Sequence, residues 1–277
     1  MTLRYRGMDR AQLDAAYNNT QAVADFPARL RAMQQQSRDL YRDRPAIVDR
    51  AYHTASRTRF DFFPAAAGPA PTMIFIHGGY WQNCNKEDFA FVARGPLSRG
   101  IHVILAEYTL APQASMTGIV GEIGLLLDYL RHSDLPLQTG QVCLAGHSAG
   151  GHLTALYRHH PLISHAMPLS ALVDLQPIRL CWLNDKLSLS DEEVERFSPL
   201  RHVLPGGVPT HIHAGGGELS ELIRHSRELA DALRAVGDRV RWQPLGDDDH
   251  FSLLQRLAEP DGLLTESLCQ LLAGQAL

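Results

Sequence analysis

Cysteine is scarce in this sequence: four residues in 277, with no two of them in a CxxC pair. A disulfide framework is therefore not expected, and free thiols in a reducing cytoplasm are the simpler interpretation. Long apolar runs are also missing, so no membrane-spanning helix is predicted. The first six residues have no apolar stretch of the kind found in secretory signals, which favours a cytoplasmic protein.

Neither sign of charge dominates: 26 Lys and Arg stand against 30 Asp and Glu, for a net charge of −4. The basic residues form no stripe and are not interleaved with aromatics, so nucleic acid is not expected as a partner. Hydrophobic residues make up 45% of the chain, which is enough for a sizeable core. These features favour a globular protein. The expected partners are a small-molecule substrate and, as an open possibility, a second copy of the chain in a homodimer.

Short apolar runs alternate with helical patterns along most of the chain. Strands are expected at 73–76, 102–106, 142–145, 166–169, 210–214 and 240–244, and an antiparallel strand pair at 52–63. Helices are expected at 86–99, 119–131, 151–160, 219–236 and 251–272. Continuous apolar runs are typical of strands buried on both faces, so the pattern predicts an α/β fold with a mostly parallel central sheet flanked by helices.

Two segments depart from this alternation. Residues 9–43 are polar and helical in character, and they predict an N-terminal helical extension packed on the main domain. Residues 175–205 carry Trp182 and the acidic run 191–193, and they predict a short lid inserted after a strand. We therefore expect one domain over 1–277 with these two additions.

The run Gly146-His147-Ser148-Ala149-Gly150 matches the pattern G-x-S-x-G. A predicted strand precedes this run and a predicted helix follows it, which is the setting of the nucleophile elbow in the α/β-hydrolase fold. Small residues on either side of the serine let strand and helix approach closely while its hydroxyl stays accessible. The pattern therefore predicts Ser148 as a catalytic nucleophile.

A second motif, His77-Gly78-Gly79-Tyr80-Trp81, follows the predicted strand 73–76. A glycine-rich backbone at this place turns N–H groups toward the nucleophile. We expect the N–H groups of Gly78, Gly79 and Ala149 to form an oxyanion hole, which stabilises the negative charge that develops on the substrate carbonyl.

The other residues of this motif have supporting roles in our interpretation. His77 is expected to hold the loop by a hydrogen bond, because it stands before the two glycines. Tyr80 and Trp81 are expected to line the substrate pocket, with plain core packing as the alternative.

The fold places its triad residues in the order serine, acid, histidine. His250 follows the last predicted strand and is expected to be the general base. Glu218 follows the strand at 210–214 and is expected to orient His250, with Glu221 as the fallback because both glutamates share a helical face.

Two groups of residues resemble metal ligands. One is the run Asp247-Asp248-Asp249-His250, and the other is the pair His211 and His213, which lie on one side of a strand. Consecutive carboxylates rarely converge on one ion, and no third ligand accompanies the histidine pair. We expect no metal site.

Several motifs of the chain are similar to those of one enzyme family. They are His77-Gly78-Gly79-Tyr80-Trp81, the elbow Gly146 to Leu153, His250-Phe251, and the supporting runs 13–19, 107–112, 170–175 and 198–200. Together they resemble the arylformamidases (kynurenine formamidases) of the α/β-hydrolase fold, which stand near the hormone-sensitive-lipase-like esterases. The acid of that family is commonly aspartate, whereas this chain has Glu218.

This resemblance implies hydrolysis of N-formyl-L-kynurenine to L-kynurenine and formate. The reaction would pass through an acyl-enzyme on Ser148 and would use no metal or organic cofactor. Two alternatives remain open from the sequence. One is a carboxylesterase that acts on small short-acyl esters, and the other is a non-catalytic small-molecule receptor on a hydrolase fold.

Overall fold

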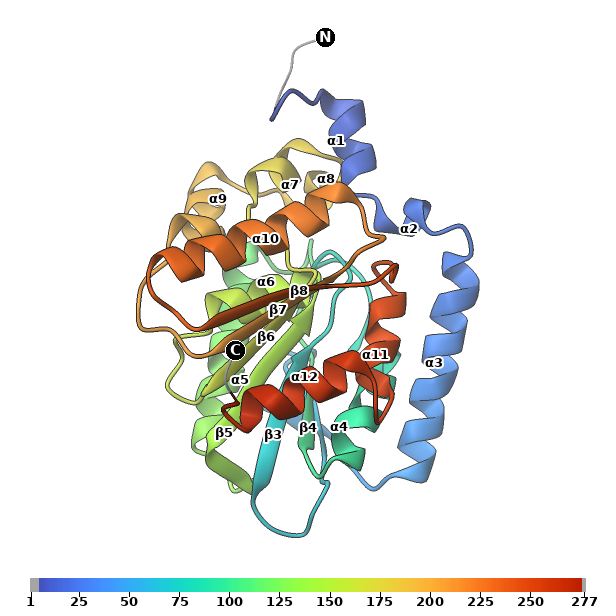
Figure 1. The fold of residues 1–277 in the computed structure, drawn as a ribbon. Helices are drawn as coiled ribbons and strands as arrows, with labels where there is room; N and C mark the ends of the chain where they lie inside the picture. Colours follow the sequence, from blue (N-terminus) through green and yellow to red (C-terminus); the bar gives the residue numbers. More distant parts are fainter. Residues whose placement is uncertain (1–4, 276–277) are drawn as a thin grey trace.

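The computed structural model describes residues 5–275, which form an eight-stranded sheet with helices on both faces (Figure 1). The strands are β1 (Ile47–Ala51), β2 (Arg59–Phe63), β3 (Ala70–Ile76), β4 (His102–Ala106), β5 (Leu137–His147), β6 (His165–Leu169), β7 (Thr210–Gly215) and β8 (Val240–Leu245). Their spatial order is β1-β2-β4-β3-β5-β6-β7-β8. The pairs β1–β2 and β2–β4 are antiparallel, and all other pairs are parallel.

The helices fall into an N-terminal group, the crossover helices and a C-terminal group. The α-helices are α1 (Arg10–Ala16), α2 (Asn19–Ala22), α3 (Phe26–Asp43), α4 (Arg94–Ser98), α5 (Met116–Arg131), α6 (Ala149–Leu156), α7 (Gln176–Leu180), α8 (Asn184–Leu187), α9 (Asp191–Phe197), α10 (Ser220–Ala235), α11 (Gln255–Ala258) and α12 (Leu263–Leu272). Three 3₁₀ segments are η1 (Lys86–Ala93), η2 (Pro199–Arg201) and η3 (Ser252–Leu254). No helix in the described part is long and apolar enough to cross a membrane.

The central strands are apolar on both faces because each face is covered by helices. In β3, Ile74 and Ile76 pack on the side of α5, whereas Met73 and Phe75 pack on the side of α12. Side chains alternate between the faces of a strand, so a strand that helices cover on both sides is expected to have apolar side chains on both faces. This confirms the predicted α/β fold with a mostly parallel sheet.

Several predicted boundaries were wrong. The antiparallel pair expected at 52–63 is formed by β1 and β2, so its first strand ends at Ala51 instead of beginning at Tyr52. The helix expected at 86–99 is divided into η1 and α4. The helix expected at 251–272 is interrupted between α11 and α12, where Pro260 and Gly262 do not favour a continuous helix.

The parallel register brings the functional loops to one edge of the sheet. Ile76 of β3 pairs with Gly146 of β5, and His147 at the end of β5 pairs with Leu169 of β6. Gly215 of β7 pairs with Leu245 of β8. The loops that follow β3, β5, β7 and β8 therefore meet at the carboxyl ends of the strands, where open α/β sheets bind their ligands.

The N-terminal segment and the segment 175–205, which the sequence predicted to be a lid, both lie near this edge. In Figure 1, α1 and α2 stand close to α7 and α8, and α3 runs down the same side as α11. Tyr17 and Leu13 are fully buried against the main core, and Met33 and Leu40 of α3 pack with the helices of the other face. The segment 175–205 contains α7, α8, α9 and η2.

Candidate active site

Ser148 occupies the tight turn between β5 and α6, with a backbone φ of 57° and ψ of −114°. Few residues other than glycine adopt a positive φ, and such strain is typical of functional positions. The turn is held by the Ser148 N–H, which donates to the carbonyl of Leu169 at 2.8 Å. A Cβ on Gly150 would lie 2.0 Å from the carbonyl oxygen of Ile76, so only glycine lets α6 approach β3 this closely.

His250 and Glu218 lie in adjacent loops and are joined by a hydrogen bond. His250 Nδ1 is 2.7 Å from Glu218 Oε2. The other carboxylate oxygen accepts from the Ser170 hydroxyl at 2.5 Å and from the Gly215 N–H at 2.6 Å. The Glu218 side chain is completely buried, and these three hydrogen bonds replace the water that it loses.

Glu221, the fallback acid, does not contact His250. Its Oε2 accepts from the Tyr17 hydroxyl at 2.9 Å and pairs with Arg224 at 2.6 Å. Although burial acts to raise it, the hydrogen bond and charge of Arg224 lower the pKa of Glu221. The two glutamates share a helical face in the sequence pattern, yet only Glu218 reaches the histidine.

The carboxylates before His250 shape its loop. Asp249 Oδ1 accepts from the N–H groups of Phe251 and Ser252, and its Oδ2 pairs with Arg29 of α3. Asp248 accepts from the Ser252 hydroxyl and pairs with Arg256. Two carboxylates of the acidic run that resembled a metal site, Asp248 and Asp249, are therefore engaged in hydrogen bonds and ion pairs of the protein itself.

His211 and His213 are likewise engaged within the core. Both rings lie within hydrogen-bond distance of the Ser267 hydroxyl, at 2.7 Å from His211 Nδ1 and 2.8 Å from His213 Nε2. Across residues 5–275 no cluster of three or more potential metal-ligating side chains occurs.

The glycine loop after β3 lies directly against the nucleophile. A Cβ built on Gly78 would be 3.2 Å from the Cβ of Ser148. Gly79 has a φ of +111°, and a Cβ there would be 2.2 Å from the carbonyl oxygen of Asn83, so this position requires glycine. Neither glycine N–H donates a backbone hydrogen bond in the described chain.

His77 holds this loop, as expected. Its Nδ1 is 2.7 Å from the carbonyl oxygen of Gly78, and its Nε2 is 2.9 Å from Glu107. Its ring stacks on Tyr108 with a centroid separation of 4.6 Å. Burial acts to raise the pKa of Glu107, but His77 and Arg57 beside it lower that pKa below its ordinary value, so the carboxylate stays ionised.

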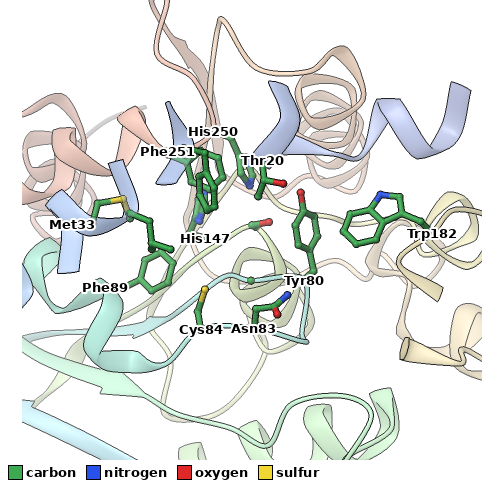
Figure 2. A pocket seen from close by; sticks show the side chains of 14 residues that line it. Thr20, Met33, Tyr80, Asn83, Cys84, Phe89, His147, Trp182, His250 and Phe251 are labelled. Atoms are coloured by element: carbon green, nitrogen blue, oxygen red, sulfur yellow. The ribbon is translucent and has the colours of Figure 1, made fainter. Parts of the chain in front are cut away.

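Ser148 and His250 open into one cavity of about 320 Å³, within the usual range for small-molecule sites. Aromatic rings form part of its wall, as Figure 2 shows, including Tyr80, Phe89, Trp182 and Phe251. The sequence did not predict that the N-terminal segment closes one side. Its contribution consists of Thr20, Phe26, Leu30 and Met33.

Tyr80 lines this cavity, but Trp81 does not. The Tyr80 hydroxyl accepts a hydrogen bond from the Asn19 N–H at 2.9 Å. The rings of Tyr80 and Trp182 pack in a T-shaped arrangement, with their centroids 5.5 Å apart. Trp81 is fully buried in the core, with its ring 5.1 Å from that of His152. The prediction for Trp81 was wrong because successive side chains of the loop diverge, and the larger ring fills the core.

Ser170 is the polar residue of the site that sequence reasoning missed. It stands at the end of β6, has a φ of 48° and donates to Glu218. A serine directly after a buried strand, at the same edge as the predicted nucleophile, is the signal that could have identified it.

Fold and site together define a hydrolase with an α/β-hydrolase fold. The BD-FAE family model matches residues 62–160, which include the glycine loop and the nucleophile turn. Curated relatives confirm the resemblance that the motifs indicated, since several of them are kynurenine formamidases. The protein of that name from Danio rerio is 28% identical over 82% of this chain and 82% of its own length. The one from Drosophila melanogaster is 25% identical over 84% of each chain.

Solved structures support the same class. A candidate thioesterase from Silicibacter sp. TM1040 aligns with a TM-score of 0.81 at 27% identity, covering 93% of this chain and 99% of that one. An esterase from the archaeon Pyrobaculum calidifontis aligns with a TM-score of 0.75 at 15% identity, covering 96% and 97%. Because the archaeal esterase is only 15% identical, its similarity to this chain concerns the fold alone.

Proposed function

We propose that this hydrolase is an arylformamidase that converts N-formyl-L-kynurenine to L-kynurenine and formate, with Ser148, His250 and Glu218 as its triad. The observation that carries the proposal is the 2.7 Å contact between His250 and Glu218, beside the strained turn of Ser148 and in the same cavity. The kynurenine formamidases among its relatives support the substrate. The aromatic wall of the cavity suits an aryl leaving group.

The reaction begins when Ser148 Oγ attacks the formyl carbon while His250 Nε2 takes the hydroxyl proton. Glu218 accepts the Nδ1–H of His250, which fixes the tautomer and stabilises the imidazolium that forms. The N–H groups of Gly78, Gly79 and Ala149 stabilise the oxyanion of the tetrahedral intermediate.

Collapse of this intermediate breaks the C–N bond, and His250 returns the proton to the departing arylamine. The formyl group is then held as an ester on Ser148. A water molecule, deprotonated by His250, attacks this ester and releases formate. His250 carries every proton transfer in this sequence and finally returns a proton to Ser148 Oγ, while the backbone amides stabilise the oxyanion by hydrogen bonds.

Substitution of the nucleophile tests the scheme. Ser148→Ala should lose nearly all hydrolysis of N-formyl-L-kynurenine and all labelling by a fluorophosphonate probe, while the thermal unfolding midpoint stays close to that of the wild type. Wild-type protein should label at Ser148. A variant that kept most of its activity, or wild-type protein that failed to label, would contradict the proposed triad.

A second candidate function is a carboxylesterase for small short-acyl esters. Esterase LipU of Mycobacterium tuberculosis is a relative at 28% identity over 62% of this chain and 67% of its own length. Comparison of kcat/KM for N-formyl-L-kynurenine and p-nitrophenyl acetate separates the two. An arylformamidase should prefer the formamide by about a thousandfold, which corresponds to about 4 kcal/mol in activation free energy. The reverse preference would establish the esterase.

A further inference from the structure

One face of α3 borders both the cavity and the loop that carries His250. Three side chains of this face line the cavity: Phe26, Leu30 and Met33. A fourth, Arg29, pairs instead with Asp249, the residue directly before His250. The four positions follow a spacing of i, i+3, i+4 and i+7, which places them together on one side of a helix. The same helix face therefore shapes the cavity and holds the loop of the proposed base.

The Asp249 carboxylate links the backbone on the two sides of His250. Its Oδ1 accepts hydrogen bonds from the N–H groups of Phe251 and Ser252, at 2.9 and 2.8 Å. Its Oδ2 pairs with the guanidinium of Arg29. The carboxylate thus belongs to the residue before His250 and binds the two residues after it. By restricting the rotation of this carboxylate, Arg29 restricts the backbone from which the His250 imidazole extends.

This ion pair is partly buried, and Arg29 is oriented by a second carboxylate. The side chains of Arg29 and Asp249 are 35% and 23% exposed. Arg29 Nε also donates to Asp25 Oδ1 at 2.8 Å. Burial acts to raise the pKa of Asp249, but the backbone N–H groups that it binds, and then the charge of Arg29, lower that pKa below its ordinary value. A pair this exposed adds little to global stability, so its main effect is on local geometry.

We propose that Arg29 is a positioning residue, which acts through Asp249 to hold His250 in the orientation needed for proton transfer. This inference rests on the proposed function, in which His250 is the general base. Arg29 does not itself line the cavity, so it affects the chemical step and not the binding of substrate. A displacement of about 1 Å in a reacting group can lower the rate about a hundredfold. Loss of one contact in a loop that also has others should lower it less.

Arg29→Gln tests the proposal, because it removes the charge and keeps part of the length of the side chain. On the better of N-formyl-L-kynurenine and p-nitrophenyl acetate, we expect kcat to fall about five- to twentyfold and KM to change less than about twofold. Arg29→Lys, which keeps a cation, should recover part of the lost kcat. A wild-type kcat in Arg29→Gln would overturn the proposal, and so would a loss confined to KM.

Two other variants of α3 serve as controls. Arg42→Gln removes ion pairs with Asp39 and Asp43 at the exposed face of the same helix, and it should leave both kcat and KM unchanged. Leu30→Ala damages the cavity wall without removing a contact of Asp249, and it should raise KM more than it lowers kcat. Equal losses of kcat in Arg29→Gln and Arg42→Gln would show a general weakening of the helix and overturn the proposal.

A double-mutant cycle tests whether Arg29 acts through Asp249. Asp249→Asn also breaks the ion pair, so it should lower kcat in the same direction as Arg29→Gln. If the two residues act as one unit, the double variant should lose no more kcat than the more impaired of the two single variants. Losses that multiply in the double variant would show independent effects and overturn this route.

The proton NMR signal of the His250 Nδ1–H keeps this test separate from the choice of reaction. Its hydrogen bond to Glu218, at 2.7 Å, makes this proton strongly deshielded, and loss of the signal in Glu218→Gln assigns it. Arg29→Gln should broaden or shift the signal, whereas Arg42→Gln should not. If Ser148→Ala kept its activity, the proposed reaction would fail, and the NMR signal would still report on Arg29. An unchanged signal in Arg29→Gln would overturn its positioning role.

Discussion

The Glu218 carboxylate combines complete burial with three hydrogen bonds, from His250, Ser170 and the Gly215 backbone. A buried carboxylate is favourable only when its charge is satisfied in this way. The extra methylene that distinguishes it from aspartate is accommodated, because the side chain starts three residues beyond Gly215 and reaches back to that N–H.

Glu218→Gln removes this charge while keeping the shape of the side chain. We expect kcat to fall by about 10³–10⁴-fold, because the amide stabilises neither the correct tautomer nor the imidazolium of His250. Steady-state kinetics on N-formyl-L-kynurenine or on p-nitrophenyl acetate measures the effect. Glu221→Gln is the control and should change kcat only a few fold, since Glu221 bonds Tyr17 and Arg224. Similar losses in both variants would argue against Glu218 as the triad acid.

Among the elements, the N-terminal helices matter most to the shape of the cavity. The segment is anchored at two places, one on α10 and one on the loop of His250. Tyr17 bonds Glu221 and lies 3.0 Å from His225, whereas Phe26 packs on Phe251 with ring centroids 4.6 Å apart. Thr20 lies between these anchors, and Phe26, Leu30 and Met33 form the rest of this side of the cavity, so the docking of the segment and the shape of the site are coupled.

Tyr17→Phe tests this coupling by removing one buried hydroxyl. It removes the hydroxyl that bonds Glu221 Oε2 and lies beside His225 Nε2, and we expect a loss of about 1–3 kcal/mol in the free energy of unfolding. KM should rise more than kcat falls, because the cavity wall is affected and the triad is not. Urea denaturation and steady-state kinetics measure the two effects.

Tyr129→Phe serves as the comparison for the Tyr17 variant. The Tyr129 hydroxyl accepts from Arg50 at the surface of α5, away from the cavity. Tyr129→Phe should lower the free energy of unfolding less than Tyr17→Phe does, and it should leave KM unchanged. An unchanged KM in Tyr17→Phe would show that the segment does not depend on this anchor.

At the scale of the whole molecule, several histidines are buried in the sheet and its helices without a charged partner. Burial is the main cause that lowers the pKa of His213 to about 3 and the pKa values of His211 and His152 to about 4. An unfolded histidine binds its proton near pH 6.5. The unfolded state therefore binds more protons than the folded state as the pH falls below that value, and the fold loses stability in acid.

His213→Asn should remove one of these protonation events. The free energy of unfolding of the wild type should decrease more steeply than that of the variant between about pH 6 and pH 4. The difference in slope should approach 1.4 kcal/mol per pH unit, the value for one proton. Urea denaturation at a series of pH values measures both slopes, and parallel curves would refute the assignment to His213.

The sequence by itself determined the class of fold and the core of the site. The buried apolar runs predicted the parallel strands, and the patterns around Ser148 and the glycine loop are local, since strand, turn and helix follow one another directly. The position of His250 after the last strand was also readable, because chain order in this fold assigns each loop its place.

Only the tertiary structure decided which side chains meet across loops. Glu218 and Glu221 are equivalent in a helical pattern, but Glu218 lies in the turn before α10 and bonds His250, whereas Glu221 lies in the first turn of α10 and bonds Tyr17. Trp81 packs in the core and the N-terminal segment closes the cavity, because side-chain direction and long-range packing depend on neighbours distant in the chain. Short-range sequence patterns carry no information about those neighbours.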